Sequence, residues 1–268
     1  MTKRFEGKVA IVTGGSMGIG RATALQLAAE GAHVVACARR KPRLDELAAD
    51  VRELGGELTA VELDLADQEA FGRLIQATFV EHGRLDVLVN NAATVIGGTV
   101  LDQDLDTWRA NFGVSVESVF VGCREAMRVM MPQGSGAIVN VSSVSSLRAG
   151  TAAGAYSAAK AAVNQFTQCA AMEAAPHNVR LNVVAAGSVE TPGMHAATQK
   201  NKAVQDVIAQ AIPMQRHAQP GELAEAICFL ASDAASFITG VVLPVDGGKT
   251  PQLYVPEFNL TNLDNRKV

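Results

Sequence analysis

The feature that most constrains the fold is a regular alternation of short apolar runs with longer segments of helical periodicity. The apolar runs, which we expect to form strands, span residues 9–12, 33–37, 58–63, 85–89, 137–141, 179–184 and 240–245. The expected helices span residues 21–30, 42–54, 67–81, 105–131, 156–175 and 220–232. Strands that are apolar at nearly every position are typical of a parallel sheet covered on both faces. Right-handed crossovers then predict a doubly wound α/β sheet of about seven strands, in the order 3-2-1-4-5-6-7.

We expect residues 1–268 to form a single domain, because no linker or repeat interrupts the alternation. Two segments stand outside it. Residues 188–219 are polar and are expected to form a lid over the substrate. Residues 249–268 follow the last strand and carry too many apolar side chains for a solvated end, so we expect this tail to pack on the cleft or on a neighbouring subunit.

Charge and targeting signals exclude several classes of protein. The net charge is −4, which gives no electrostatic basis for binding nucleic acid or an anionic membrane. No apolar run approaches the length of a membrane span, and the basic residues at the N-terminus are not followed by an apolar stretch. The four cysteines are far apart and are expected to be buried and reduced. We therefore expect a cytoplasmic protein.

A glycine-rich loop follows the first expected strand and precedes the first helix. It is the run Thr13-Gly14-Gly15-Ser16-Met17-Gly18-Ile19-Gly20. Glycine lets the chain turn sharply and lets its backbone approach a pyrophosphate, while the helix N-terminus offers free N–H groups to the anion. A tight structural turn is the plain alternative, but the strand before and the helix after the loop favour a dinucleotide site.

A second motif is suited to proton transfer. Tyr156 and Lys160 are four residues apart on one expected helix, so their side chains share a face. A nearby ammonium lowers the pKa of a phenol from about 10, which lets Tyr156 exchange a proton with a reacting oxygen. Ser143 would donate a hydrogen bond to the same oxygen. On its own, the pair could be a buried tyrosine with an amphipathic lysine.

These motifs resemble the short-chain dehydrogenase/reductase family, in its compact NADP-preferring form. The matches, in family order, are Thr13-Gly14-x-x-x-Gly18-x-Gly20, Asn90-Asn91-Ala92, Ser143, Tyr156-x-x-x-Lys160, Gly187-x-x-x-Thr191 and Asp246-Gly247-Gly248. The resemblance implies a Rossmann-type sheet, hydride transfer and a homotetramer or homodimer. It places the cofactor on residues Gly14, Ser16, Met17, Gly18, Ile19, Gly20, Asn91, Ala92, Tyr156, Lys160, Gly187, Val189 and Thr191.

The end of the second expected strand bears on the choice of cofactor. The chain reads Ala36-Cys37-Ala38-Arg39-Arg40-Lys41 there, with no acid to bind both ribose hydroxyls. Arg39 is suited to pair with a 2′-phosphate, with Arg40 or Lys41 adding positive charge nearby, so we expect NADP, with NAD possible. Solvated charges at the start of a helix are the alternative. By resemblance, Asp64 and Leu65 border the adenine. The alternative for Asp64 is a helix-capping acid.

The chain departs from the family pattern at two places. The family has an asparagine seven residues after Trp108, where this chain has Ser115. We expect Ser115 to join the catalytic set by holding a water against Lys160, with Asn111 one turn earlier able to share the task. Small-residue helix packing is the alternative. The second departure is Ala186, where the family has proline before Gly187.

The sequence therefore predicts an oxidoreductase that transfers hydride between NADP(H) and a hydrophobic ketone or secondary alcohol. The expected substrate walls are mostly apolar and come from residues Val95, Ile96, Val144, Ser145, Leu147 and Met194. A 3-oxoacyl thioester reductase and a non-catalytic nucleotide-binding regulator remain as alternatives. The five histidines show no metal-ligand spacing, so no metal is expected, although His195 in the lid could touch substrate.

Overall fold

A computed structural model describes residues 3–198 and 200–252. Its seven parallel strands are ordered β3-β2-β1-β4-β5-β6-β7, which confirms the predicted sheet. The strands are β1 (Val9–Thr13), β2 (His33–Ala38), β3 (Glu57–Glu62), β4 (Val87–Asn90), β5 (Gly136–Ser143), β6 (Val179–Ala186) and β7 (Val242–Val245). The last sixteen residues of the predicted tail, 253–268, lie outside the described residues.

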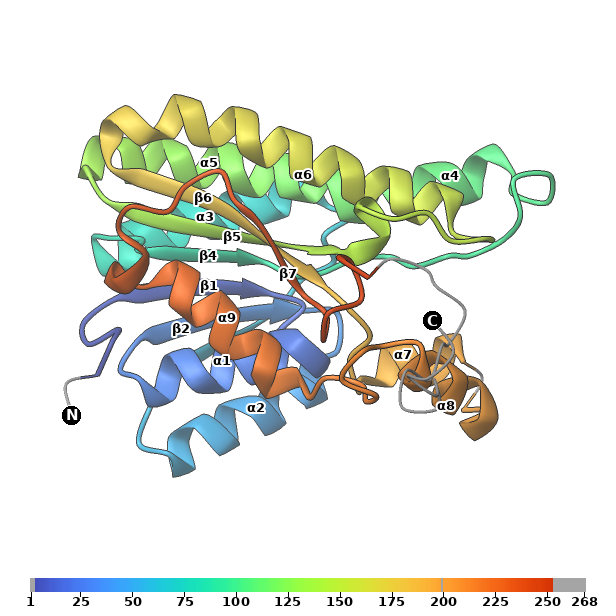
Figure 1. The fold of residues 1–268 in the computed structure, drawn as a ribbon. Coiled ribbons are helices and arrows are strands. Elements are labelled where there is room, and N and C mark those ends of the chain that lie inside the picture. The colour runs from blue at the N-terminus through green and yellow to red at the C-terminus, as the bar shows by residue number, and fades with distance from the viewer. Residues whose placement is uncertain (1–2, 199, 253–268) are drawn as a thin grey trace, which may run out of the picture.

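Helices cover the sheet on both faces (Figure 1). On one face lie α1 (Gly18–Ala29), α2 (Lys41–Glu53) and α9 (Pro220–Ala231), and on the other α3 (Gln68–His82), α5 (Ser118–Gln133) and α6 (Gly154–Ala174). The strands are buried because alternate side chains enter two separate cores. Ile11 and Leu88 pack against α3, α5 and α6, whereas Val12 and Val89 pack against α1, α2 and α9.

The long helix expected over residues 105–131 is broken. α4 (Leu105–Phe112) is followed by a π-helical turn (Gly113–Glu117) and then by α5. Such turns often occur at functional sites. Periodicity could not reveal this break, because all three pieces keep one buried face.

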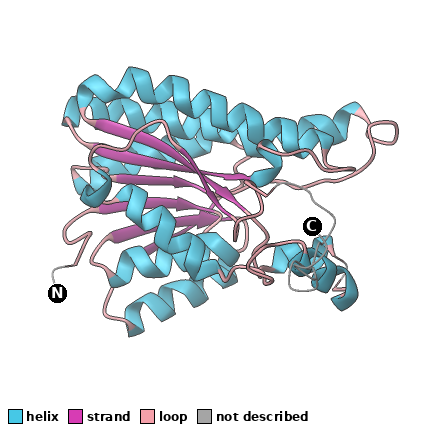
Figure 2. Cartoon of the chain, in the orientation of Figure 1, coloured by secondary structure: helices cyan, strands magenta, loops and turns pink. Residues whose placement is uncertain are grey.

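The polar segment after β6 contains two short helices, α7 (Pro192–Ala197) and α8 (Lys202–Gln210). They stand beside the sheet, beyond its carboxyl edge (Figures 1 and 2). Within the described residues, no helix combines the length and apolar character needed to cross a bilayer. Cys37, Cys123 and Cys228 are buried as expected, but Cys169 is exposed, because it lies on the outer face of α6.

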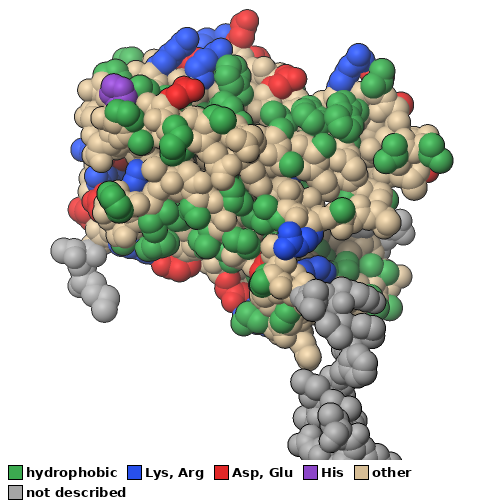
Figure 3. All heavy atoms as spheres, turned by 45° about the horizontal axis from the view of Figure 1, so that its top comes forward, with side chains coloured by type: hydrophobic (Ala, Val, Ile, Leu, Met, Phe, Trp, Pro, Cys, Tyr) green, Lys and Arg blue, Asp and Glu red, His purple; other side chains and the backbone are tan. Residues whose placement is uncertain are grey.

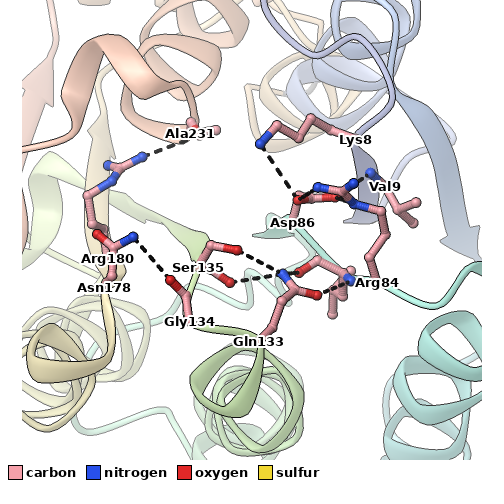
Figure 4. Close-up of polar contacts among 11 residues, drawn as sticks. Lys8, Val9, Arg84, Asp86, Gln133, Gly134, Ser135, Asn178, Arg180 and Ala231 are labelled. Atoms are coloured by element: carbon pink, nitrogen blue, oxygen red, sulfur yellow. Dashed lines mark hydrogen bonds and ion pairs between the residues drawn. The ribbon is translucent and has the colours of Figure 1, made fainter.

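At the amino edge of the sheet, charged side chains form hydrogen bonds that connect neighbouring elements (Figure 4). The buried Asp86 carboxylate accepts hydrogen bonds from Val9 N at 2.8 Å and from Arg84 Nε at 2.7 Å. Arg180 on β6 donates to Leu230 O at 2.7 Å and to Ser232 O at 3.0 Å. These carbonyls lie at the end of α9, where the helix has no further N–H groups to satisfy them. Arg180 therefore fastens α9 to the sheet.

Arg180→Met should lower the free energy of unfolding by about 2 kcal/mol, because buried carbonyls lose charged donors. Urea denaturation measures this. Arg52→Met, at an exposed arginine in the last turn of α2, is the matched control and should have little effect. Equal stability of the two variants would show that Arg180 does not hold α9.

Candidate active site

A cleft of about 610 Å³ lies along the carboxyl ends of the strands. It spans the point where the chain order reverses, between β1 and β4, which is where open α/β sheets bind ligands. Of the predicted site residues, those that line it are Gly14, Ser16, Met17, Gly18, Ile19, Arg39, Arg40, Asp64, Leu65, Asn91, Ala92, Ser143, Tyr156, Lys160, Gly187, Val189 and Thr191. Gly20 and Ser115 are not on its surface.

The glycine loop is shaped for a close ligand. Gly14 has φ +65°, and a Cβ there would lie 2.8 Å from Nδ2 of Asn91. A Cβ at Gly20 would collide with Gly14 O and the same Asn91 nitrogen. Both glycines therefore let the loop fold tightly against the end of β4.

The amino end of α1 is open to an anion. Met17 precedes the helix without a side-chain cap, and the first turn carries no acid. The free N–H groups at the start of α1 and the positive end of its dipole fit a pyrophosphate. The residues present therefore fit a dinucleotide.

The sequence interpretation overlooked Thr13, which joins the loop to β4. Its buried Oγ1 accepts hydrogen bonds from Asn91 N at 2.9 Å and from Ala92 N at 3.1 Å. Asn91 Nδ2 returns a hydrogen bond to Thr13 O at 2.9 Å. A threonine at the end of a buried strand, opposite a polar pair ending the next strand, could have signalled this link.

The end of the cleft next to β2 carries positive charge. Arg39 and Arg40 are exposed and line it, and Arg40 also contacts the sulfur of Met17. Lys41 is paired with Asp45 on α2. Asp64 lines the cleft, but its Oδ1 accepts from Ala66 N at 3.0 Å, while Asp67 caps α3. Asp64 therefore does not cap the helix.

Ser143, Tyr156 and Lys160 meet where β5 ends against α6. Ser143 is the last residue of β5, and its Oγ accepts from Ser145 N at 3.2 Å. Lys160 is buried, and its Nζ donates to Val141 O at 2.8 Å and lies 6.0 Å from the centre of the Tyr156 ring. The end of β5 and one face of α6 therefore bring these three groups together.

Burial has the largest effect on the pKa values of Tyr156 and Lys160. It raises the pKa of the Tyr156 phenol, and the hydrogen bond with Ser143 opposes the shift. Burial also lowers the pKa of Lys160 from 10.5 to about 8. The lowering of the Tyr156 pKa expected from the sequence would need the charge of a bound nicotinamide, and it stays a prediction.

Lys160→Met should raise the unfolding free energy at pH 7 by up to about 3 kcal/mol, because folding then no longer buries a charge. The lost hydrogen bond to Val141 O reduces this gain. Between pH 8 and 10.5 the folded wild type releases the proton that the unfolded chain keeps, so wild-type stability rises with pH and the gain shrinks. Urea unfolding of the wild type and of Lys160→Met at pH 8 and at pH 10.5 measures this change. Lys202→Met, at an exposed lysine, is the control and should show no such pH dependence. If the increase in unfolding free energy of Lys160→Met did not depend on pH, burial of the Lys160 charge would not be its cause.

Ser115 is fully buried in the π-helical turn and contacts a loop at the cleft. Its Oγ accepts from Thr94 N and donates to Thr94 O, both at 3.3 Å. Both roles of the hydroxyl are thus engaged by one backbone residue. A water relay from Ser115 to Lys160 remains a prediction.

If the relay operates, Ser115→Ala should lower kcat about fivefold, the equivalent of one hydrogen bond of about 1 kcal/mol, and shift its pH profile. The KM for the cofactor should hardly change. The pH dependence of kcat measures this, and an unaltered profile would argue against a relay through this hydroxyl.

The expected substrate walls are only partly where the sequence placed them. Val95, Ser145 and Met194 line the cleft, together with Val114 from the π-helical turn, which the sequence interpretation missed. Ile96, Val144 and Leu147 do not line it.

His195 also lies off the cleft surface and contacts two residues of the 188–219 segment. Its Nε2 is 3.2 Å from Glu190 Oε2, and its Nδ1 is 3.1 Å from Gln205 Nε2. Within residues 3–198 and 200–252, no three His, Cys, Asp or Glu side chains gather closely enough to hold a metal ion.

Comparisons with known proteins identify the family of this chain. A family model described as enoyl-(acyl carrier protein) reductase matches residues 14–250. A 3-oxoacyl-[acyl-carrier-protein] reductase of Thermotoga maritima is 36% identical over 245 residues, which cover 91% of this chain and 98% of that protein. A cis-4-hydroxycyclohexanecarboxylate dehydrogenase of Sinomonas cyclohexanicum is 39% identical over 254 residues, covering 93% and 99%.

A solved structure gives the same result. It is described as an NAD(P)-dependent gluconate 5-dehydrogenase of Beutenbergia cavernae with NADP bound at low occupancy, and it superposes with a TM-score of 0.88. It is 36% identical, and the match covers 94% of this chain and all of that one. The chain therefore belongs to the short-chain dehydrogenase/reductase family and is an NAD(P)-dependent oxidoreductase of alcohol and carbonyl groups.

Proposed function

We propose that the protein transfers hydride between NADP(H) and a hydrophobic ketone or the matching secondary alcohol, with Tyr156 as the general acid and base. The observation that carries the proposal is the meeting of Ser143, Tyr156 and Lys160 in a cleft that also holds the glycine loop and Arg39. The nicotinamide supplies or accepts the hydride. Every other part of the chemistry falls to side chains of this chain.

Each side chain has a distinct part in the reduction. Ser143 Oγ donates a hydrogen bond to the carbonyl oxygen and so stabilises its developing negative charge. Tyr156 gives its proton to the same oxygen, and takes it back in the oxidation. Lys160 holds positive charge beside the phenol and favours the phenolate. Val95, Val114 and Met194 exclude water and favour an apolar substrate.

The direct test follows nicotinamide absorbance with NADPH and a panel of cyclic and acyclic ketones, and with NADP and the corresponding alcohols. Turnover of apolar ketones with NADPH supports the proposal. NADPH binding without turnover of any ketone or alcohol in the panel would contradict the proposed substrate class.

A 3-oxoacyl thioester reductase is the second candidate, and the Thermotoga maritima relative is named a 3-oxoacyl-[acyl-carrier-protein] reductase. The same assay separates the two candidates when it includes an acetoacetyl thioester. A kcat/KM for the thioester far above that for every simple ketone would favour this candidate.

We also propose that the protein assembles as a homotetramer or homodimer in the cytoplasm. Support comes from the outer face of α5 and α6, where Phe120 is 45% and Met172 is 61% exposed. Figure 3 turns this side toward the viewer and shows hydrophobic side chains grouped on it. Sedimentation of the wild type and of Phe120→Glu tests the assembly, since a buried charge should split it.

A further inference from the structure

Asn111 on α4 makes a two-point contact with a single residue of a loop. Its Oδ1 accepts from Ile96 N at 3.2 Å, and its Nδ2 donates to Ile96 O at 3.1 Å. The same Nδ2 also donates to Thr107 O, on its own helix, at 3.0 Å. Asn111 is fully buried, and this pairing fixes both the position and the orientation of the Ile96 peptide groups.

The contact belongs to a larger clamp on residues 94–98. Ser115, one turn after Asn111, binds both peptide groups of Thr94 in the same manner. Gln103 Nε2 adds a second hydrogen bond to Ile96 O at 3.2 Å. Alternate residues of the loop are thus bound along one side, as in a strand paired at one edge.

The clamped loop joins two functional parts of the molecule. Val95, between the two bound residues, is 60% exposed and lines the cleft. At the far end of the loop, Gly98 N donates to Ala152 O at 2.9 Å, two residues before α6 begins. Since α6 carries Tyr156, the loop spans from α4 to the helix with the expected catalytic groups.

We propose that Asn111 is a positioning residue that fixes Val95 as a wall of the substrate cleft and thereby limits the size of the ketone or alcohol accepted. The inference rests on the proposed function. Asn111 does not touch the substrate, and its effect reaches the substrate only through the backbone of Ile96. When the Asn111 hydrogen bonds are lost, the loop that carries Val95 can move away from the cleft. The kcat/KM for bulky substrates should then rise relative to that for small ones.

Hydrogen exchange tests the clamp without any need for activity. In Asn111→Leu, which keeps the size of the side chain, the amides of residues 94–98 should exchange about tenfold faster. Ser118→Ala is the matched control, because this buried hydroxyl donates to Val114 O of its own helical segment and to no residue of the 94–98 loop among residues 3–198 and 200–252. Unchanged exchange in Asn111→Leu would overturn the proposal. If that variant does not fold, Asn111→Asp keeps the acceptor for Ile96 N and serves in its place.

Substrate specificity tests the consequence. The ratio of kcat/KM for camphor to that for cyclohexanone should rise about tenfold in Asn111→Leu, with the KM for the cofactor unchanged. Val95→Ala should shift the ratio in the same direction. The variant that combines Asn111→Leu with Val95→Ala should show a ratio close to that of either single variant, because both changes act on the same wall of the cleft. Independent, additive shifts, or an equal loss for both ketones, would overturn the proposal.

The two tests also separate this inference from the proposed function. If the wild type reduces no ketone and oxidises no alcohol, the proposed function fails and with it the claim about substrate size. Even then, the hydrogen-exchange measurement on Asn111→Leu decides whether Asn111 holds residues 94–98 in place. If the wild type is active but exchange and specificity are unaltered in Asn111→Leu, only the inference fails.

Discussion

Tyr156→Phe should lower kcat by about 10²–10⁴-fold, the usual contribution of general acid catalysis. The phenolic oxygen is the group lost, and the ring that fills the site between Ser143 and Lys160 remains. Because burial raises the pKa of the Tyr156 phenol above its ordinary value of about 10, the group carries its proton at neutral pH and is ready to act as an acid. Steady-state kinetics with NADPH and the best ketone measure the loss.

The matching control is the affinity of Tyr156→Phe for NADPH, measured by quenching of protein fluorescence. It should stay close to that of the wild type, since the glycine loop and Arg39 are untouched. A variant that keeps more than about a tenth of the wild-type kcat would remove Tyr156 from the role of general acid.

Arg39→Asp should weaken NADPH much more than NADH and shift the preference between them by about 30- to 150-fold. The variant loses a charge-assisted contact with the 2′-phosphate and adds repulsion, which together cost about 2–3 kcal/mol. NADH carries no 2′-phosphate, so its KM should change little. The ratio of kcat/KM for the two cofactors gives the result.

Arg43→Asp is the control that distinguishes a direct contact between Arg39 and the 2′-phosphate from a general effect of net charge on NADPH binding. Arg43 is an exposed arginine of α2 that does not line the cleft, and its replacement changes the net charge equally. It should leave the cofactor preference nearly as it is. Equal changes of KM for NADPH and NADH in Arg39→Asp would show that Arg39 does not meet the phosphate.

Local patterns in the sequence were enough to predict the sheet, because strand and helix periodicities depend on which neighbouring residues are apolar. Once the strands are parallel, their carboxyl ends share one edge. The glycine loop after β1, Asn91 after β4 and Ser143 at the end of β5 then had to converge. The spacing of Tyr156 and Lys160 likewise placed both on one face of α6.

Tertiary structure decided which partners each polar side chain meets. No local pattern shows that Asn111 and Ser115 bind a loop that lies 15 and 21 residues earlier in the chain, or that a π-helical turn breaks the expected long helix there. Val114 enters the cleft from the π-helical turn, which packs against α6, whereas the His195 ring is turned toward Glu190 and Gln205. The direction of the Tyr156 and Lys160 pKa shifts was likewise set by burial, which depends on the packed surroundings of a group. The sequence by itself therefore determined the elements and the edge where the chemistry gathers, while long-range contacts decided the shape and electrostatics of the cleft.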